Sequence, residues 1–149
     1  MPLAEHHFAL PKRLTELLDT GVWPVSAKFG TAHRSGFRLG SESARAISTD
    51  DDQIALMLPP FHTIADEVHD GNRFWTEHLS NVGEIDYRKA LIIADFGPGS
   101  DSVIVLYYGH EAVPSVKYLK WSGNGQDIVH QWVRTHPSFD QFAAAVGLR

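Results

Sequence analysis

The sequence predicts a single domain in which an antiparallel sheet packs against helices. The chain of 149 residues has the length of one domain, and its 43% hydrophobic and 21% charged residues are ordinary for a globular protein. Residues 90–121 contain three apolar stretches joined by short turns, which is typical of an antiparallel meander. Amphipathic helix patterns lie near both ends of the chain. We therefore expect residues 1–149 to form one domain.

A short helix is expected over residues 11–20. Its apolar positions fall at i, i+4, i+7 and i+8 and define one face, formed by Leu10, Leu14, Leu17 and Leu18. Pro11 suits the first turn of a helix, and Gly21 suits the left-handed position that ends one. Residues 22–44 are irregular and predict either a long functional loop or short strands.

Two strands are expected next, at residues 45–48 and 53–58, around a turn that contains Asp50, Asp51 and Asp52. Consecutive apolar residues in the second strand indicate burial on both of its faces. Pro59 and Pro60 then end that strand.

Thr63, with Asp66 three residues later, predicts the start of a helix, and Gly71 predicts its end. Asn72 predicts the cap of another short helical piece, which would direct apolar side chains to the core. Those side chains are Phe74, Trp75 and Leu79.

The second half of the chain contains the meander. Buried or half-buried strands are expected at residues 90–96, 103–108 and 116–121, with turns at 97–101 and 109–114. A Gly/Asn turn is expected at 122–126, and residues 128–133 are compatible with either a strand or a helix.

A helix is expected at the C-terminal end. Ser138 and Gln141 have the spacing of a capping box, and Gly147 followed by Leu148 predicts a Schellman end. The apolar face of this helix contains Phe139, Phe142, Ala143 and Val146.

Composition excludes several classes of function. With no cysteine, the chain has no disulfide, thiolate zinc site, iron–sulfur cluster or cysteine nucleophile. A net charge of −5 argues against direct nucleic-acid binding. No apolar run reaches the roughly 18 residues of a membrane span, and no secretory signal is visible, so we expect no membrane association and a cytoplasmic location.

Candidate catalytic groups are weak. Asp66, Glu67, His69 and Asp70 form the densest set of metal ligands, but a solvated helix face explains them better. A strand rather than a helix follows the glycine-rich residues 97–101, which argues against a phosphate-binding loop. Asp95 and Asp101 flank that turn without a recognisable nucleophile. We expect no catalytic residue, no metal site and no cofactor.

A resemblance to a known family rests on residues 91–102 (LIIADFGPGSDS). The segment is followed by Pro114-Ser115-Val116, by Trp121, and by the Ser-Phe-x-x-Phe pattern of residues 138–142. In order and approximate spacing, residues 88–148 resemble the SUKH superfamily. Many members carry Asp-Tyr-Arg after the second strand, where this chain has Tyr107-Tyr108-Gly109. That superfamily includes the yeast cell-wall assembly regulator and bacterial immunity proteins.

The resemblance implies an α+β domain with a largely antiparallel or mixed sheet, and a protein that is not an enzyme. Bacterial members neutralise secreted toxins, many of them nucleases, by direct binding. The expected partner is therefore a cognate toxin, and the sequence leaves the oligomeric state open. The expected partner-binding residues lie in acidic, turn and aromatic positions: Asp50, Asp51, Asp52, Pro98, Ser100, Asp101 and Trp121.

Two other functions stay open at this point. The chain could be a regulatory scaffold that binds an endogenous partner, as eukaryotic members of the superfamily do. It could also be a metal-dependent hydrolase built on Asp66, His69 and Asp70.

Overall fold

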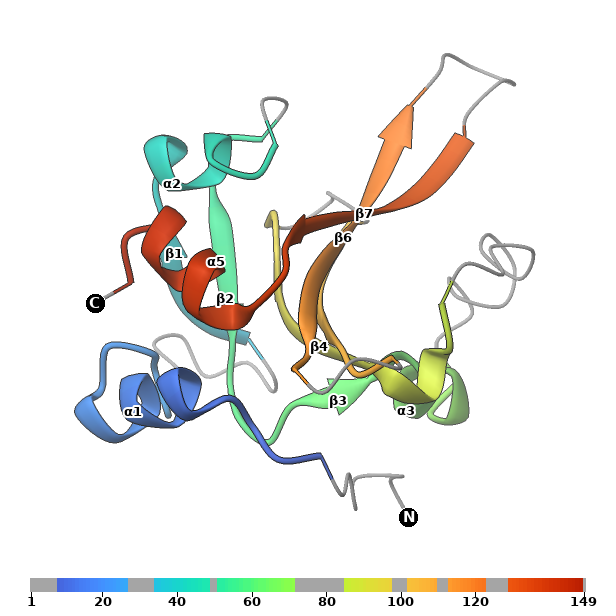
Figure 1. The fold of residues 1–149 in the computed structure, drawn as a ribbon, viewed down its shortest axis with the longest axis horizontal. Coiled ribbons are helices and arrows are strands. Elements are labelled where there is room, and N and C mark those ends of the chain that lie inside the picture. Colours follow the sequence, from blue (N-terminus) through green and yellow to red (C-terminus); the bar gives the residue numbers. More distant parts are fainter. Residues whose placement is uncertain are drawn as a thin grey trace.

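The computed structural model describes residues 8–26, 34–48, 51–71, 85–97, 102–109, 113–122 and 129–148. The described residues form a seven-stranded sheet with helices on both faces, so the α+β fold class is confirmed (Figure 1). The elements in chain order are α1 (Lys12–Thr20), β1 (Arg34–Leu39), α2 (Ser41–Arg45), β2 (Ile54–Met57), β3 (His62–Thr63), α3 (Ile64–His69), the 3-10 turn η1 (Tyr87–Lys89), β4 (Ala90–Asp95), β5 (Val103–Tyr107), β6 (Ser115–Ser122), β7 (Val129–His136) and α5 (Phe139–Ala145).

The sheet has the strand order β1-β2-β4-β5-β6-β7, and β3 also pairs with β4. All of these pairs are antiparallel, and the predicted meander is confirmed as β4, β5 and β6 and extended by β7. The segment 128–133, which the sequence left ambiguous, belongs largely to β7. Cross-strand pairing decides its conformation, since Trp132 lies opposite Leu119 and Val133 opposite Tyr118.

The central strand β4 is buried along its whole length, as its apolar composition predicts. It pairs with β5 on one side, and with both β2 and β3 on the other. Ile93 contributes to the core on one face of the sheet and Ile92 to the core on the opposite face. The strand β2 is likewise buried on both faces at Ile54, Ala55 and Leu56, which confirms the sequence prediction.

Helices α1, α2 and α5 belong to the larger core, whereas α3 and η1 lie at the opposite face with the smaller core (Figure 1). Trp23, fully buried after α1, anchors the larger core. Its indole N–H donates a hydrogen bond to the Met57 carbonyl at 2.8 Å, and its ring meets Phe61 edge-on at 6.0 Å. No helix in the described part of the chain is long and apolar enough to cross a membrane.

The ends of the terminal helices follow the sequence pattern. Gly21 ends α1 with a φ of 79°, and Gly147 follows α5 with a φ of 82°. The Leu148 N–H donates to the Ala143 carbonyl at 2.8 Å, and the Gly147 N–H donates to the Ala144 carbonyl at 3.3 Å. This pair of bonds is the predicted Schellman motif. Ser138 caps α5 by accepting from the Gln141 N–H at 3.3 Å.

The strand predicted at residues 45–48 is wrong. Arg45 ends α2, and the following residues keep helical hydrogen bonds, with the Ser48 N–H donating to the Ala44 carbonyl at 2.9 Å. Ala44 is fully buried, so this turn is fixed by its packing rather than by strand pairing. The irregular region 22–44 contains β1 and most of α2. The strand β1 agrees with short strands, one of the two alternatives predicted for this region. Its bounds could not be predicted because it is an edge strand with Gly36 inside it and Phe37 exposed.

The predicted helical piece with Phe74, Trp75 and Leu79, and the turn at 122–126 apart from its first residue, lie outside the described residues.

The burial of β4 predicts the effect of truncating Ile93, which is fully buried. Ile93→Ala should lower the free energy of unfolding by about 2–5 kcal/mol, and Ile93→Val by about 0.5–1.5 kcal/mol, because the larger deletion leaves the larger cavity. Urea unfolding followed by circular dichroism measures both values. Equal stability of the two variants and the wild type would contradict the assigned role of β4.

His136 predicts a pH dependence of stability. It lies at the end of β7, 6.1 Å from the Phe142 ring between centroids, and burial lowers its pKa from 6.5. The unfolded chain therefore binds this proton more readily than the folded chain, so the contribution of His136 to stability is full above about pH 7 and is lost as the pH falls below 6.5 and through the lower pKa of the folded chain. His136→Phe should lose less stability than the wild type between pH 7.5 and pH 5.5 in urea titrations. An identical loss in both proteins would contradict the prediction.

Candidate functional site

A pocket of about 140 Å³ lies at the end of the sheet where β5 begins and β6 ends. We call it the Asp51–Trp121 pocket. Three segments that are distant in sequence form it: the connection between α2 and β2, the residue before β5, and the second half of β6. Its lining consists of Ser48, Asp51, Ser102, Tyr118, Leu119, Lys120 and Trp121.

Backbone and side-chain hydrogen bonds fix two walls of this pocket. Ser48 is buried at the end of the helical turn that follows α2, and its carbonyl accepts from the Asp51 N–H at 3.5 Å. Ser102 is also buried, and its hydroxyl donates to the Leu119 carbonyl. Both serines are therefore tied to neighbouring backbone groups by hydrogen bonds. These two walls of the pocket are formed in the free protein and do not depend on mobile side chains alone.

Asp51 and Lys120 give the pocket one acidic and one basic group, and Tyr118 and Trp121 give it aromatic surface. Tyr118 is held by Phe96, whose ring meets it edge-on at 5.6 Å between centroids. Aromatic side chains with a few polar groups are typical of the anchoring pockets in protein interfaces. The arrangement therefore suits recognition of an amphipathic side chain.

One aspartate of the acidic run, residues 50–52, is paired with an arginine of the same chain. Asp52 carries its carboxylate 3.7 Å from the Arg45 guanidinium, with 86% of the Asp52 side chain exposed. Such an exposed pair adds little stability, but it partly neutralises the field of the run. Asp51 faces the pocket, which makes it the better placed of the two described aspartates to contact a partner.

The structure thus brings Asp51 and Trp121, two of the predicted partner-binding residues, to one pocket, with Asp52 beside it. Sequence reasoning missed Tyr118, Lys120 and Ser48, although the alternation of β6 could have placed Tyr118 and Lys120 on one face. The remaining predicted residues, Asp50, Pro98, Ser100 and Asp101, lie outside the described residues.

The start of the turn at 97–101 is visible and is tightly packed. Gly97 has a φ of 103°, and its N–H donates to the Asp95 Oδ1 atom at 2.8 Å. A Cβ atom at Gly97 would collide with the Gln53 side chain, which accepts from Arg38 at 3.0 Å. The buried Asp95 therefore organises the start of this turn.

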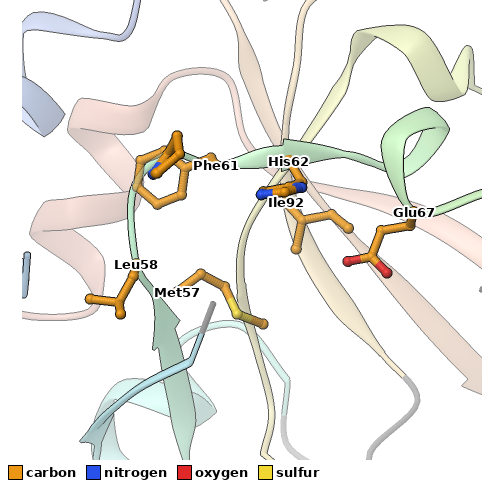
Figure 2. Close-up of a pocket in the computed structure, with 7 residues that line it drawn as sticks. Met57, Leu58, Phe61, His62, Glu67 and Ile92 are labelled. Carbon is orange, nitrogen blue, oxygen red and sulfur yellow. The ribbon is translucent and has the colours of Figure 1, made fainter. Parts of the chain in front are cut away.

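A second pocket, of about 30 Å³, lies at the junction of β2, β3 and α3, and Figure 2 shows its lining. We call it the Met57–Glu67 pocket. The strand β2 pairs with β4 and ends at Met57. The chain then passes through Pro59 and Pro60, and pairs with β4 again from His62, in β3. The detour opens a hollow beside Ile92. The lining consists of Met57, Leu58, Pro60, Phe61, His62, Glu67 and Ile92.

The densest predicted ligand set does not converge in the structure. Asp66 is fully buried and caps α3: its Oδ2 atom accepts from the Thr63 N–H, and its own N–H donates to the Thr63 hydroxyl, both at 3.0 Å. His69 and Asp70 are exposed at the other end of the helix. Within the described ranges, no three His, Asp or Glu side chains are close enough together to hold a metal ion.

The capping role of Asp66 predicts a stability effect. Asp66→Ala should lower the free energy of unfolding by about 1–3 kcal/mol, because it leaves the buried Thr63 N–H without its acceptor. Asp66→Asn keeps an acceptor oxygen and should cost less. Thermal and urea unfolding measure both. A stable Asp66→Ala variant whose only defect is weaker binding of added zinc or manganese would contradict this assignment.

Comparison of the chain with protein-family models, with curated proteins and with solved structures gave no match.

Proposed function

We propose that this chain is a protein-binding domain without catalytic activity, of the SUKH type, and that it is an immunity protein that neutralises a bacterial toxin in the cytoplasm. The ordered motifs of residues 88–148 support the family assignment, since they fall on β4, β5, β6 and α5 of one α+β domain. The departure at Tyr107-Tyr108-Gly109 has a structural consequence in this chain. Tyr108 donates to the Ala9 carbonyl at 3.0 Å and stacks on Phe8, so here it holds the N-terminal segment.

The convergence of Asp51 and Trp121 on one preformed pocket is the observation that carries the proposal. These residues come from segments some 70 positions apart, and each was a candidate for partner binding on sequence alone. An open pocket with aromatic walls offers an anchoring point for a side chain of the partner.

The mechanism is steric. The partner inserts a side chain into the Asp51–Trp121 pocket, and the surrounding surface covers the part of the toxin that meets its substrate. The net charge of −5 favours encounter with a basic protein such as a nuclease. Aromatic contacts with Tyr118 and Trp121 then lengthen the lifetime of the complex.

The experiment is an affinity capture from the native host with the wild-type chain, followed by identification of the bound protein. Trp121→Ala should lose at least about 2 kcal/mol of affinity for that protein, roughly thirtyfold, since buried aromatic anchors contribute this much to interfaces. Asp51→Lys should weaken binding and change its salt dependence. Titration calorimetry with the purified pair measures both effects.

A matched control is Asp19→Lys, which makes the same change of charge at an exposed position on α1. It should leave the affinity within about twofold of the wild-type value. The captured protein should be toxic when expressed alone and harmless when expressed with the chain. An endogenous, non-toxic partner would instead assign the chain to the scaffold class, and unchanged affinity in the Trp121→Ala and Asp51→Lys variants would remove the pocket from the interface.

A further inference from the structure

We propose that the Met57–Glu67 pocket is a second recognition site, one that accepts the end of a lysine side chain from a basic partner protein. This inference goes beyond the proposed function, and the pocket shares no lining residue with the Asp51–Trp121 pocket. It rests on the size of the hollow, on the polarity of its walls, and on the charge of the chain segment that builds it.

The size of the pocket selects its occupant. A volume of about 30 Å³ has room for about two water-sized groups. These few water-sized positions suit a small group better than an aromatic ring or the four heavy atoms of a guanidinium group. The terminal methylene and the ammonium group of a lysine are two heavy atoms and fit this space.

The walls divide the pocket into an apolar part and a polar rim. Met57, Leu58 and Ile92 supply aliphatic surface, and Phe61 adds a ring. The polar groups are Glu67 and His62, whose neutral imidazole can accept a hydrogen bond. Figure 2 shows the Glu67 side chain reaching from α3 toward Ile92, with its carboxylate on the pocket side. Lysine side chains bury their methylene stem along apolar surface and keep their charge at a polar group, which is the pattern that these walls complement.

The charge of the adjoining helix favours a cation. Between Arg45 and Arg73 the chain contains no lysine or arginine, and α3 with its C-cap carries Asp66, Glu67 and Asp70, of which Glu67 lines the pocket. Both β2 and α3, which carry the walls of the pocket, belong to this stretch. A carboxylate has about four acceptor positions, so Glu67 can receive an ammonium group in addition to bonds that it already makes.

A methionine in the lining provides a direct test. Met57 lines the pocket, so methyl-labelled methionine gives a reporter at the site in the nuclear magnetic resonance spectrum, and Met57→Leu assigns its resonance. The probes are three short peptides, acetyl-Gly-X-Gly-amide with X as lysine, arginine or norleucine, titrated at constant pH and ionic strength. Norleucine keeps the aliphatic stem of lysine and lacks its charge.

The proposal predicts that the lysine peptide shifts the Met57 methyl resonance saturably, and that the arginine and norleucine peptides bind several times more weakly. Glu67→Gln should weaken lysine-peptide binding by up to about fivefold, as expected for one partly exposed ion pair. Glu42→Gln, the same change in the first turn of α2, should leave the binding unchanged.

A Met57 resonance that does not respond to the lysine peptide would overturn the proposal. So would equal binding of the three peptides, or equal binding by Glu67→Gln and the wild type. The peptide comparison within the wild-type protein keeps the test valid if Glu67→Gln is unstable. Because none of these measurements involves Asp51 or Trp121, failure here is distinguishable from failure of the proposed toxin-binding function.

Discussion

The complete burial of β4 is the constraint on which the rest of the structure depends. A strand that is buried on both faces needs hydrogen-bonding partners on both edges. It obtains them from β5 on one side, and from β2 and β3 in succession on the other. The sharing of one edge by two short strands forces the detour through Pro59 and Pro60, and that detour opens the Met57–Glu67 pocket.

The same arrangement positions the other pocket. The end of β4 at Asp95 and the start of β5 at Val103 are paired, which brings Ser102 against the last residues of β6. The helical turn after α2 places Ser48 and Asp51 over this end of the sheet. Both pockets thus draw one wall from the acidic stretch between Arg45 and Arg73, and both proposals of a basic partner rest on this shared feature.

Elements whose identity depends on local chemistry were predictable from the sequence. The ends of α1 and α5 follow from Gly21 and Gly147, and the start of α3 follows from Thr63. The position of the exposed edge strand β1 within residues 22–44 was not predictable, because Gly36 interrupts it and its pairing with β2 is a tertiary interaction. The residues after Arg45 were wrongly predicted as a strand. The helix before them, α2, has only five residues and buries only Ala44, so the sequence shows no helical repeat of apolar positions there.

For the candidate site too, the sequence predicted what depends on residue type but not what depends on tertiary contacts. Acidic and aromatic residue types singled out Asp51 and Trp121, but residue type carries no information about distance. The pocket exists because β6 pairs with β5 and the α2–β2 connection folds over both, and these contacts join positions far apart in the chain. In the sequence Glu67 was interpreted as part of a solvated helix face or as a possible metal ligand, and not as a pocket residue, since the hollow beside Ile92 arises from strand geometry and has no local signature.

The central claim is that the partner docks over the Asp51–Trp121 pocket, and site-specific photo-crosslinking tests it most directly. A benzoylphenylalanine group replaces Trp121 in one protein and Lys12 in another; Lys12 lies on α1 with 91% of its side chain exposed. Each protein is irradiated with the purified partner that affinity capture identifies. We expect a covalent adduct through position 121 and none through position 12. An adduct through position 12 alone would contradict it.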